Sequence, residues 1–547
     1  MKKIFFISFL LILNACEKRV KQPSVTWTPN DETQELVDQQ KHENPRMRFK
    51  LINSKILDKN DIWKAFDEDL AYFSETDYES LKPLILEKDI PTLQAEIANN
   101  QLTYENLTLF YLYRIRKFES DNQVSLNAVI ALNPHVLKEA RESDKNRNKN
   151  KQHEIYGMPI LLKDNIGFEG LPTTAGAIAL QNNQATDAFI TKQLKSKGAL
   201  ILGKANLSEW AYYLCTGCPV GYSAIGGQTL NPYGRKVFES GGSSSGSGVS
   251  VAANFAVAAV GSETSGSILS PSSQNSVVGL KPTIGVLSRT GIVPISSTLD
   301  TPGPMTKSVT DNAILLDAMT GKDSKDTASV ESSFRLDKLV HEELVGKRFG
   351  VFKNLLERDS IYKQTVEKIK SAGAEIVELN PEQTQLTGFL TLLNIDMKHD
   401  LPQYLSTQSS KNVTVKNVAD VVAFNLQDTL VRIPYGQQLF QGIVNDTTSI
   451  EAFEKIKNNL HEVGTAYFDE PMNTHQLDAI LSINNYHAGF AAVAKHPALT
   501  VPMGYKTSGE PISLTFIGKS FEEQKLLTLG LAFEKLTHAR IIPKFYQ

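Results

Sequence analysis

Two glycine- and serine-rich stretches, ESGGSSSGSG at Glu239–Gly248 and GSETSGS at Gly261–Ser267, decide how this chain is interpreted. A largely apolar segment, Val249–Val260, separates them and leaves Ser243 and Ser267 in the turns at its two ends. A serine hydroxyl attacks an amide carbonyl only when an adjacent base takes its proton. The two serines are therefore candidate nucleophiles, provided that the chain supplies a base.

The candidate base lies upstream in PILLKDNI at Pro159–Ile166, where Lys163 follows an apolar run. A lysine in water is almost fully protonated at neutral pH, whereas burial lowers its pKa and frees the amine to accept a proton. Strand alternation places Leu161, Lys163 and Asn165 on one face. The alternative is a lysine at a strand end whose amine reaches water. A buried lysine with two serines predicts an amide hydrolase that uses neither histidine nor metal.

Length and composition are those of a globular enzyme. The 547 residues are 41% hydrophobic and 21% charged, which supports a sizeable core, and the formal net charge of −3 gives no indication of nucleic-acid binding. Three cysteines exclude a disulfide-rich scaffold. The ten histidines form neither an H-E-x-x-H motif nor a Cys/His cluster, which argues against a zinc hydrolase. We therefore expect no metal and no cofactor.

The first residues are expected to be a targeting signal rather than part of the fold. Two lysines precede Ile4–Leu13, an apolar run too short to span a bilayer as a helix. Ala15 and Cys16 follow, a junction that resembles a bacterial lipoprotein signal; an ordinary secretory signal cut nearby is the alternative. We expect residues 1–16 to be a signal peptide, with lipidation of Cys16. The protein would then be an exported lipoprotein, anchored to a membrane and facing the periplasm or the cell exterior.

The rest of the chain divides into a linker and one catalytic domain. Residues 17–46 are polar, contain three prolines and lack apolar periodicity, so they are expected to be a flexible tether. Residues 47–547 are expected to form the catalytic domain. The motifs that carry the candidate site residues are expected to form its core, at about 156–310. Strand-like and helix-like segments alternate there, which predicts an α/β architecture. The stretch 331–475 is less patterned and is expected to be largely helical.

The order of several motifs resembles that of the amidase signature family. Among them are GMPILLKDNI at Gly157–Ile166, ANLSEW at Ala205–Trp210, GGSSSG at Gly241–Gly246, VVGLKPTIG at Val277–Gly285 and GIVPISSTLDTPGPM at Gly291–Met305. The resemblance covers roughly residues 95–545 and is weakest at 331–475. It implies the fold of that family, an α/β domain in which a central mixed twisted β-sheet is covered by α-helices.

The resemblance also implies a role for each candidate site residue. Ser267 is expected to be the nucleophile, Ser243 to relay its proton and Lys163 to receive it. The peptide bond between Gly242 and Ser243 is expected to be cis.

An oxyanion hole is expected from the turn of Thr264, Ser265, Gly266 and Ser267, because successive backbone N–H groups can stabilise a tetrahedral intermediate. Two positions depart from the family pattern. Position 265 is serine, where the family commonly has aspartate or glycine. Position 276 is also serine, Ser276, where glycine is usual. Neither departure replaces a member of the expected triad.

Rival motifs fit less well. The stretch Gly242–Gly246 formally matches the G-x-S-x-G elbow of α/β-hydrolases, but polar and basic residues at Tyr233–Ser240 stand where the elbow needs an apolar strand. A phosphate-binding loop requires lysine after its second glycine, where this chain has serine. Cys215 and Cys218 form a C-x-x-C near the expected cleft, and the sequence leaves open whether they are a disulfide or free thiols.

The sequence thus predicts a membrane-tethered serine amidase that hydrolyses a carboxylic amide to an acid plus ammonia or an amine through an acyl-enzyme. One alternative is an amidotransferase A-subunit-like enzyme, although that role needs cytosolic partners and tRNA, which the export signal disfavours. Another is a weakly catalytic or non-catalytic amide-binding lipoprotein, which the serines at 265 and 276 would allow. We expect a small-molecule or peptide amide as the substrate and no nucleic-acid partner. Neither the particular amide nor the oligomeric state follows from the sequence.

Overall fold

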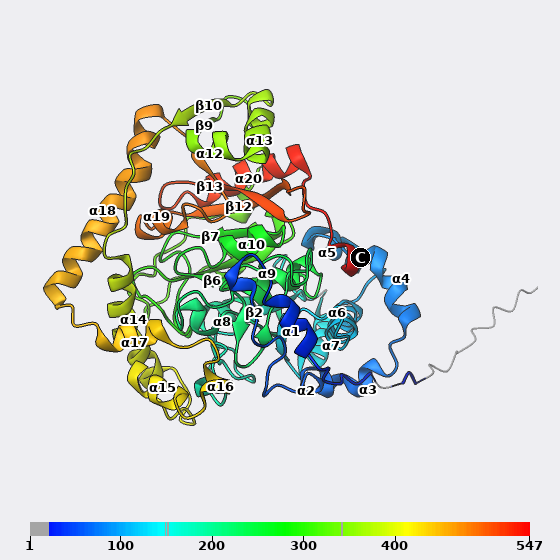
Figure 1. Cartoon of the computed structure of the whole chain (residues 1–547). Coiled ribbons are helices and arrows are strands. Elements are labelled where there is room, and N and C mark those ends of the chain that lie inside the picture. The colour runs from blue at the N-terminus through cyan, green and yellow to red at the C-terminus, as the bar shows by residue number, and fades with distance from the viewer. Residues whose placement is uncertain (1–20, 24, 148, 150–151, 341–342) are drawn as a thin grey trace, which may run out of the picture.

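The computed structural model describes residues 21–23, 25–147, 149, 152–340 and 343–547. Within them, a large mixed sheet is surrounded by helices, which confirms the expected α/β fold (Figure 1). The eleven described strands of this sheet follow the order β1-β3-β2-β6-β8-β7-β12-β13-β11-β9-β10. Their bounds are β1 Val129–Leu132, β2 Pro159–Lys163, β3 Leu200–Ala205, β6 Ala258–Glu263, β7 Val278–Lys281, β8 Thr301–Thr306, β9 Arg348–Phe352, β10 Glu375–Leu379, β11 Ala479–Ile483, β12 Ala498–Tyr505 and β13 Pro511–Ile517. A separate ribbon pairs β4 Tyr222–Ser223 with β5 Gly227–Gln228.

The centre of the sheet explains the apolar runs in the sequence. Strand β2 lies between β3 and β6 and runs parallel to both, and every residue of β2 and β6 is buried. A strand covered on both faces needs a continuous apolar run, which PILL and AAV provide. The first polar residues after these apolar runs, Lys163 in β2 and Ser262 in β6, therefore lie near the ends of the two strands.

The helices surround the sheet and differ greatly in length (Figure 1). In the first half of the chain they are α1 Thr33–Gln39, α2 Asn60–Trp63, α3 Asp67–Leu70, α4 Glu75–Ile85, α5 Ile90–Ala98, α6 Tyr104–Glu119, α7 Val136–Asn146, α8 Phe189–Ser196, α9 Ser245–Ala252 and α10 Leu269–Gln274. In the second half they are α11 Val309–Met319, α12 Lys353–Arg358, α13 Ser360–Ser371, α14 Phe389–Thr407, α15 Val418–Asn425, α16 Thr429–Arg432, α17 Gln438–Asn445, α18 Ile450–His475, α19 Ala488–Val493 and α20 Glu523–Thr537. The 3-10 helices are η1 Pro45–Met47, η2 Lys64–Phe66, η3 Ile178–Leu180, η4 Glu209–Tyr212, η5 Leu336–Lys338 and η6 Lys544–Tyr546. None of the described helices is both long and apolar enough to cross a lipid bilayer.

The stretch 331–475 is largely helical, as its composition indicates, but it also adds β9 and β10 to one edge of the sheet. Helices α14, α15, α17 and α18 lie together at one side of the molecule (Figure 1). Apolar side chains of this group, including Met397 and Phe440, pack with Trp210 from η4 in a second apolar cluster. The helical region is thereby joined to the loop that follows β3.

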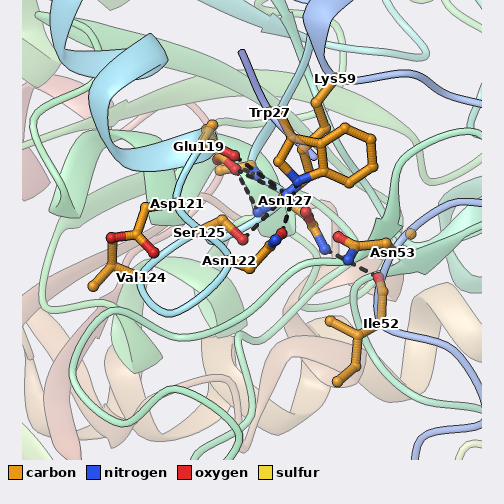
Figure 2. A network of polar contacts seen from close by, with 12 residues as sticks. Trp27, Ile52, Asn53, Lys59, Glu119, Asp121, Asn122, Val124, Ser125 and Asn127 are labelled. Carbon is orange, nitrogen blue, oxygen red and sulfur yellow. Dashed lines mark hydrogen bonds and ion pairs between the residues drawn. The ribbon is translucent and has the colours of Figure 1, made fainter. Parts of the chain in front are cut away.

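Part of the segment expected to be a tether differs from that expectation. Trp27 is only 5% exposed, and its indole N–H donates to Asn122 Oδ1 at 2.7 Å (Figure 2). Helix α1 lies within the same segment, and Glu35 on it pairs with Arg235 at 3.3 Å. This packing involves a single tryptophan and a short helix, and neither produces a periodic apolar pattern in the sequence. The sequence therefore did not predict it. Residues 1–16, including Cys16, lie outside the described residues.

A buried polar network beneath Trp27 holds this segment against the rest of the fold (Figure 2). The Lys59 amine lies 5.5 Å from the centre of the Trp27 ring, donates to Ser125 Oγ at 3.1 Å and lies 3.9 Å from the Glu119 carboxylate. Glu119 also accepts hydrogen bonds from the N–H groups of Asn127 and Ala128. The carboxylate thus compensates a buried ammonium and two buried backbone donors, as burial of such groups requires.

Candidate active site

The sheet topology brings the candidate base and the glycine-rich turns to one edge. Lys163 ends β2, and the neighbouring parallel strand β6 ends at Glu263, directly before the turn 264–267. Carboxyl ends of adjacent parallel strands meet at the same sheet edge. The other serine-rich stretch crosses this edge as well, because the Ser244 hydroxyl donates to the Ser262 carbonyl at 3.0 Å and accepts from the Ser262 N–H at 3.1 Å.

Lys163 is fully buried and surrounded by hydroxyl and carbonyl oxygens. Its Nζ lies 2.8 Å from Ser243 Oγ, 3.0 Å from the Ser262 carbonyl oxygen and 2.9 Å from Ser262 Oγ. Burial lowers the pKa of Lys163 to about 7, although the carboxylates of Asp300 and Glu263 act in the opposite direction. A large fraction of the amine is therefore neutral near pH 7.

The oxygen partners of Lys163 fit both protonation states of its amine. A neutral amine has two N–H donors and one lone pair, whereas an ammonium group has three donors. The amine contacts three oxygens, which the ammonium form satisfies as the donor of all three hydrogen bonds; in the neutral form, two donors can stay on the Ser262 oxygens while the lone pair accepts the hydroxyl proton of Ser243. This arrangement allows Lys163 to accept a proton from Ser243.

Ser262 is the residue of this site that the sequence motifs did not single out. Its Oγ also accepts from Asn165 Nδ2 at 2.9 Å, so Lys163 at the end of β2 and Asn165 just after it both donate to the same hydroxyl. The signal was present in the sequence, because Ser262 is the polar residue next to the end of a buried apolar strand. Only the pairing of β2 with β6 reveals that it faces Lys163.

The peptide bond between Gly242 and Ser243 is cis. Ser243 is fully buried, and its carbonyl oxygen accepts from the Ser208 N–H at 3.0 Å. A side chain at position 242 would place its Cβ 2.6 Å from both Ser208 Oγ and Val220 Cγ1, which is too close for any residue but glycine. Glycine at 242 thus lets the chain pass tightly beside Ser208 and present Ser243 to Lys163.

Ser267 lies alongside this segment and is only partly buried. Its carbonyl oxygen accepts from the Ser244 N–H at 3.1 Å, which joins the two serine-bearing turns through their backbones. Among the described residues, no hydrogen bond links the hydroxyl of Ser267 with that of Ser243. The structure therefore brings all three residues of the expected triad to one place, with a direct side-chain contact between Lys163 and Ser243.

The turn before Ser267 presents unused backbone donors. Within the described part of the chain, no acceptor takes the N–H groups of Ser265, Gly266 or Ser267. The following N–H groups, those of Ile268 and Leu269, donate to the buried carboxylate of Glu263 at 2.7 and 3.0 Å. Gly266 has φ of +86°, a conformation that glycine adopts without strain. Glu263 and Gly266 thus help to fix the conformation of the turn directly before α10.

A cavity of about 190 Å³ adjoins the site on the Ser262 side. It is lined by Asn165, Ser262 and Thr264 and, across from them, by Asp400 and Tyr404 of α14. Thr264 Oγ1 donates to Asp300 Oδ1 at 2.5 Å, and Asp300 lines the same cavity. Helix α14 thus forms one wall of a cavity that extends to Ser262, a hydrogen-bond partner of Lys163.

The cysteine pair that the sequence left open forms a disulfide, between Cys215 and Cys218. The loop that carries it follows η4 and reaches the helical region, because the Leu439 N–H donates to the Leu214 carbonyl at 3.2 Å. Both cysteines also line a small space beside the buried carboxyl of Glu209. The bridge therefore constrains the loop between the catalytic core and α17.

Comparison with known proteins agrees with this geometry. A family model described as Amidase matches residues 106–483. This chain belongs to the amidase family. It is 35% identical to a probable amidase of Arabidopsis thaliana over 482 residues, which cover 84% of this chain and 92% of the relative. The resemblance inferred from the motifs is thereby confirmed, and the protein is an amide-hydrolysing enzyme of this family.

Two further relatives of this amidase are informative. The crystal structure of the native peptide amidase from Stenotrophomonas maltophilia has a TM-score of 0.79 and 37% identity, covering 84% of this chain and 99% of that one. The glutamyl-tRNA(Gln) amidotransferase A-subunit of Zymomonas mobilis is 32% identical over 447 residues, covering 75% of this chain and 90% of the relative. The amidotransferase alternative is thus no better supported than simple amide hydrolysis.

Proposed function

We propose that this amidase hydrolyses its substrate through an acyl-enzyme on Ser267, with Ser243 as proton relay and Lys163 as base. The observation that carries the proposal is the fully buried Lys163 amine, which lies 2.8 Å from Ser243 Oγ and within 3.0 Å of both oxygens of Ser262. A base with a pKa near the working pH is effective in proton transfer.

Acylation and deacylation use the same proton relay in this proposal. The Ser267 oxygen bonds to the amide carbonyl carbon while its proton passes to Ser243 Oγ and the Ser243 proton passes to Lys163. The carbonyl oxygen becomes an oxyanion that the free N–H groups of the turn can bind. Collapse breaks the C–N bond, and the relay returns the proton to the leaving ammonia or amine. Water then attacks the ester by the same relay, releasing the carboxylic acid and restoring the Ser267 hydroxyl.

The two departures from the family pattern are compatible with this chemistry. Backbone donors do not depend on the side chain at 265. Ser276 adopts φ of +51°, in the region that favours glycine, and its hydroxyl bonds to that of Tyr505 at 2.8 Å. The altered residue is thus accommodated by the C-terminal part of the sheet, and a non-catalytic binding role receives no specific support.

Active-site labelling with a fluorophosphonate, followed by mass spectrometry of tryptic peptides, tests the proposal. We expect the label on Ser267, no label in Ser267→Ala, and slower labelling at the same residue in Ser243→Ala. A label on Ser243 or Ser244 would contradict the assignment and favour a nucleophile-elbow mechanism.

We also propose that the protein is an exported lipoprotein anchored through Cys16. The charged start, short apolar run and Ala15-Cys16 junction support this proposal. The disulfide between Cys215 and Cys218 supports an oxidising compartment, because such bonds are rare in the cytosol. Cys16→Ala should leave the precursor unprocessed or release the protein from the membrane fraction, and unchanged processing and fractionation would refute the anchor.

A further inference from the structure

Two consecutive asparagines after β11 are used very differently by the fold. The N–H of Asn484 donates to the Ser513 carbonyl at 3.0 Å, and its side-chain Oδ1 accepts from the Ser513 N–H at 2.8 Å. Its carbonyl oxygen accepts from Thr515 Oγ1 at 2.5 Å. The side chain of Asn485 is partly buried and makes no hydrogen bond with the described residues. Asn484 therefore holds the loop to β13 and leaves the amide of Asn485 unused.

The unused amide lies against the turn that carries the proposed nucleophile. A Cβ on Gly266 would stand 3.0 Å from Asn485 Nδ2 and 3.5 Å from Asn485 Cβ. Gly266 directly precedes Ser267, and consecutive Cα atoms are about 3.8 Å apart. A reacting carbonyl carbon must lie about 3 Å from the serine oxygen, with its own oxygen about 3 Å from the turn's N–H groups. An acyl group held there lies within reach of Asn485.

The start of α19 packs closely beside this amide. Gly489 is the second residue of α19, and a Cβ on it would stand 3.2 Å from Leu386 Cδ1 and 3.8 Å from Ser265 Oγ. Tyr486, next to Asn485, is 60% exposed. Glycine at 489 thus lets Leu386 and the start of α19 pack closely beside the turn that carries Ser267.

We propose that Asn485 is a substrate-binding residue that hydrogen-bonds a peptide group on the acyl side of the scissile amide, so that the enzyme selects amides of N-acylated amino acids or peptides. The inference rests on the proposed function, since it needs the acyl group on Ser267. A primary amide offers one acceptor and two donors without charge, which matches the C=O and N–H of a peptide group. A simple aliphatic amide offers nothing at that position.

A matched pair of substrates tests this inference. N-acetyl-leucinamide carries the peptide group, whereas 4-methylpentanamide has the same side chain and scissile amide but lacks the acetylamino group. We expect wild-type enzyme to prefer N-acetyl-leucinamide. Asn485→Ala should lower its kcat/KM for that substrate about tenfold, as loss of one buried hydrogen bond in a binding site does. Its kcat/KM for 4-methylpentanamide should change less than about twofold.

Two further variants separate binding from folding. Asn485→Asp keeps the shape of the side chain but loses its donors, and it should show the same selective loss. Asn484→Ala disturbs the loop itself and should lower activity on both substrates in parallel. A parallel loss in the Asn485 variants, or a wild-type enzyme without preference, would overturn the inference, even when fluorophosphonate still labels Ser267. Absence of labelling at Ser267 in the wild type would instead overturn the proposed function and, with it, this inference.

Discussion

The lowered pKa of Lys163 predicts a specific dependence of hydrolysis on pH. With a pKa of about 7, half of the lysine is neutral at pH 7. With the ordinary value of about 10.5, only about one molecule in 3,000 would carry a neutral amine, so burial increases the available base about 10³-fold. We expect kcat/KM to rise roughly tenfold per pH unit below about pH 6 and to level off above about pH 8.

Replacing the base should remove this behaviour. Lys163→Arg keeps a charge that cannot be lost near neutral pH, so it should lower kcat/KM by about 10²–10⁴-fold or more, as should Lys163→Ala. The assay is kcat/KM between about pH 5 and pH 9, with thermal melts to show that the variants fold. An acid limb centred near pH 10, or near-native turnover by Lys163→Arg, would refute a neutral lysine base.

Three other perturbations test Ser262, the buried carboxyl of Glu209 and the disulfide. Ser262→Ala removes one acceptor of the Lys163 amine and should lower the plateau of kcat/KM about tenfold without abolishing it, as steady-state kinetics can check. Burial raises the pKa of Glu209 to about 8, so the protonated carboxyl favours the folded state, and the free energy of unfolding should fall by about 1.4 kcal/mol per pH unit from about pH 4.5 to about pH 8. Urea unfolding of Glu209→Gln should lack this slope, and parallel curves for variant and wild type would contradict the assignment. Replacing both Cys215 and Cys218 by serine should lower the free energy of unfolding by about 2 kcal/mol, given the short loop, and reducing the wild type should have the same effect in urea titrations.

Much of the site was predictable because its signals are local. The lysine after PILL, the glycines around Ser243 and the turn before Ser267 stand in short motifs whose spacing reflects strand ends and tight turns. Ser262 was missed because its role depends on a neighbouring strand, and its type alone does not distinguish it from other serines. The packing of Trp27 was missed for a similar reason, since one aromatic side chain leaves no periodic pattern.

The sequence by itself determined the family and the α/β fold and predicted Lys163, Ser243 and Ser267 as site residues, because these inferences depend on ordered motifs along the chain. Only the tertiary structure decided the surroundings of those residues. It placed two Ser262 oxygens on the lysine amine, paired Cys215 with Cys218, and brought Asn485 against Gly266 from a distant part of the chain. The physical reason is that the pKa of a buried amine and the reach of an unused amide depend on which strands and loops become neighbours. Short-range patterns do not contain that information.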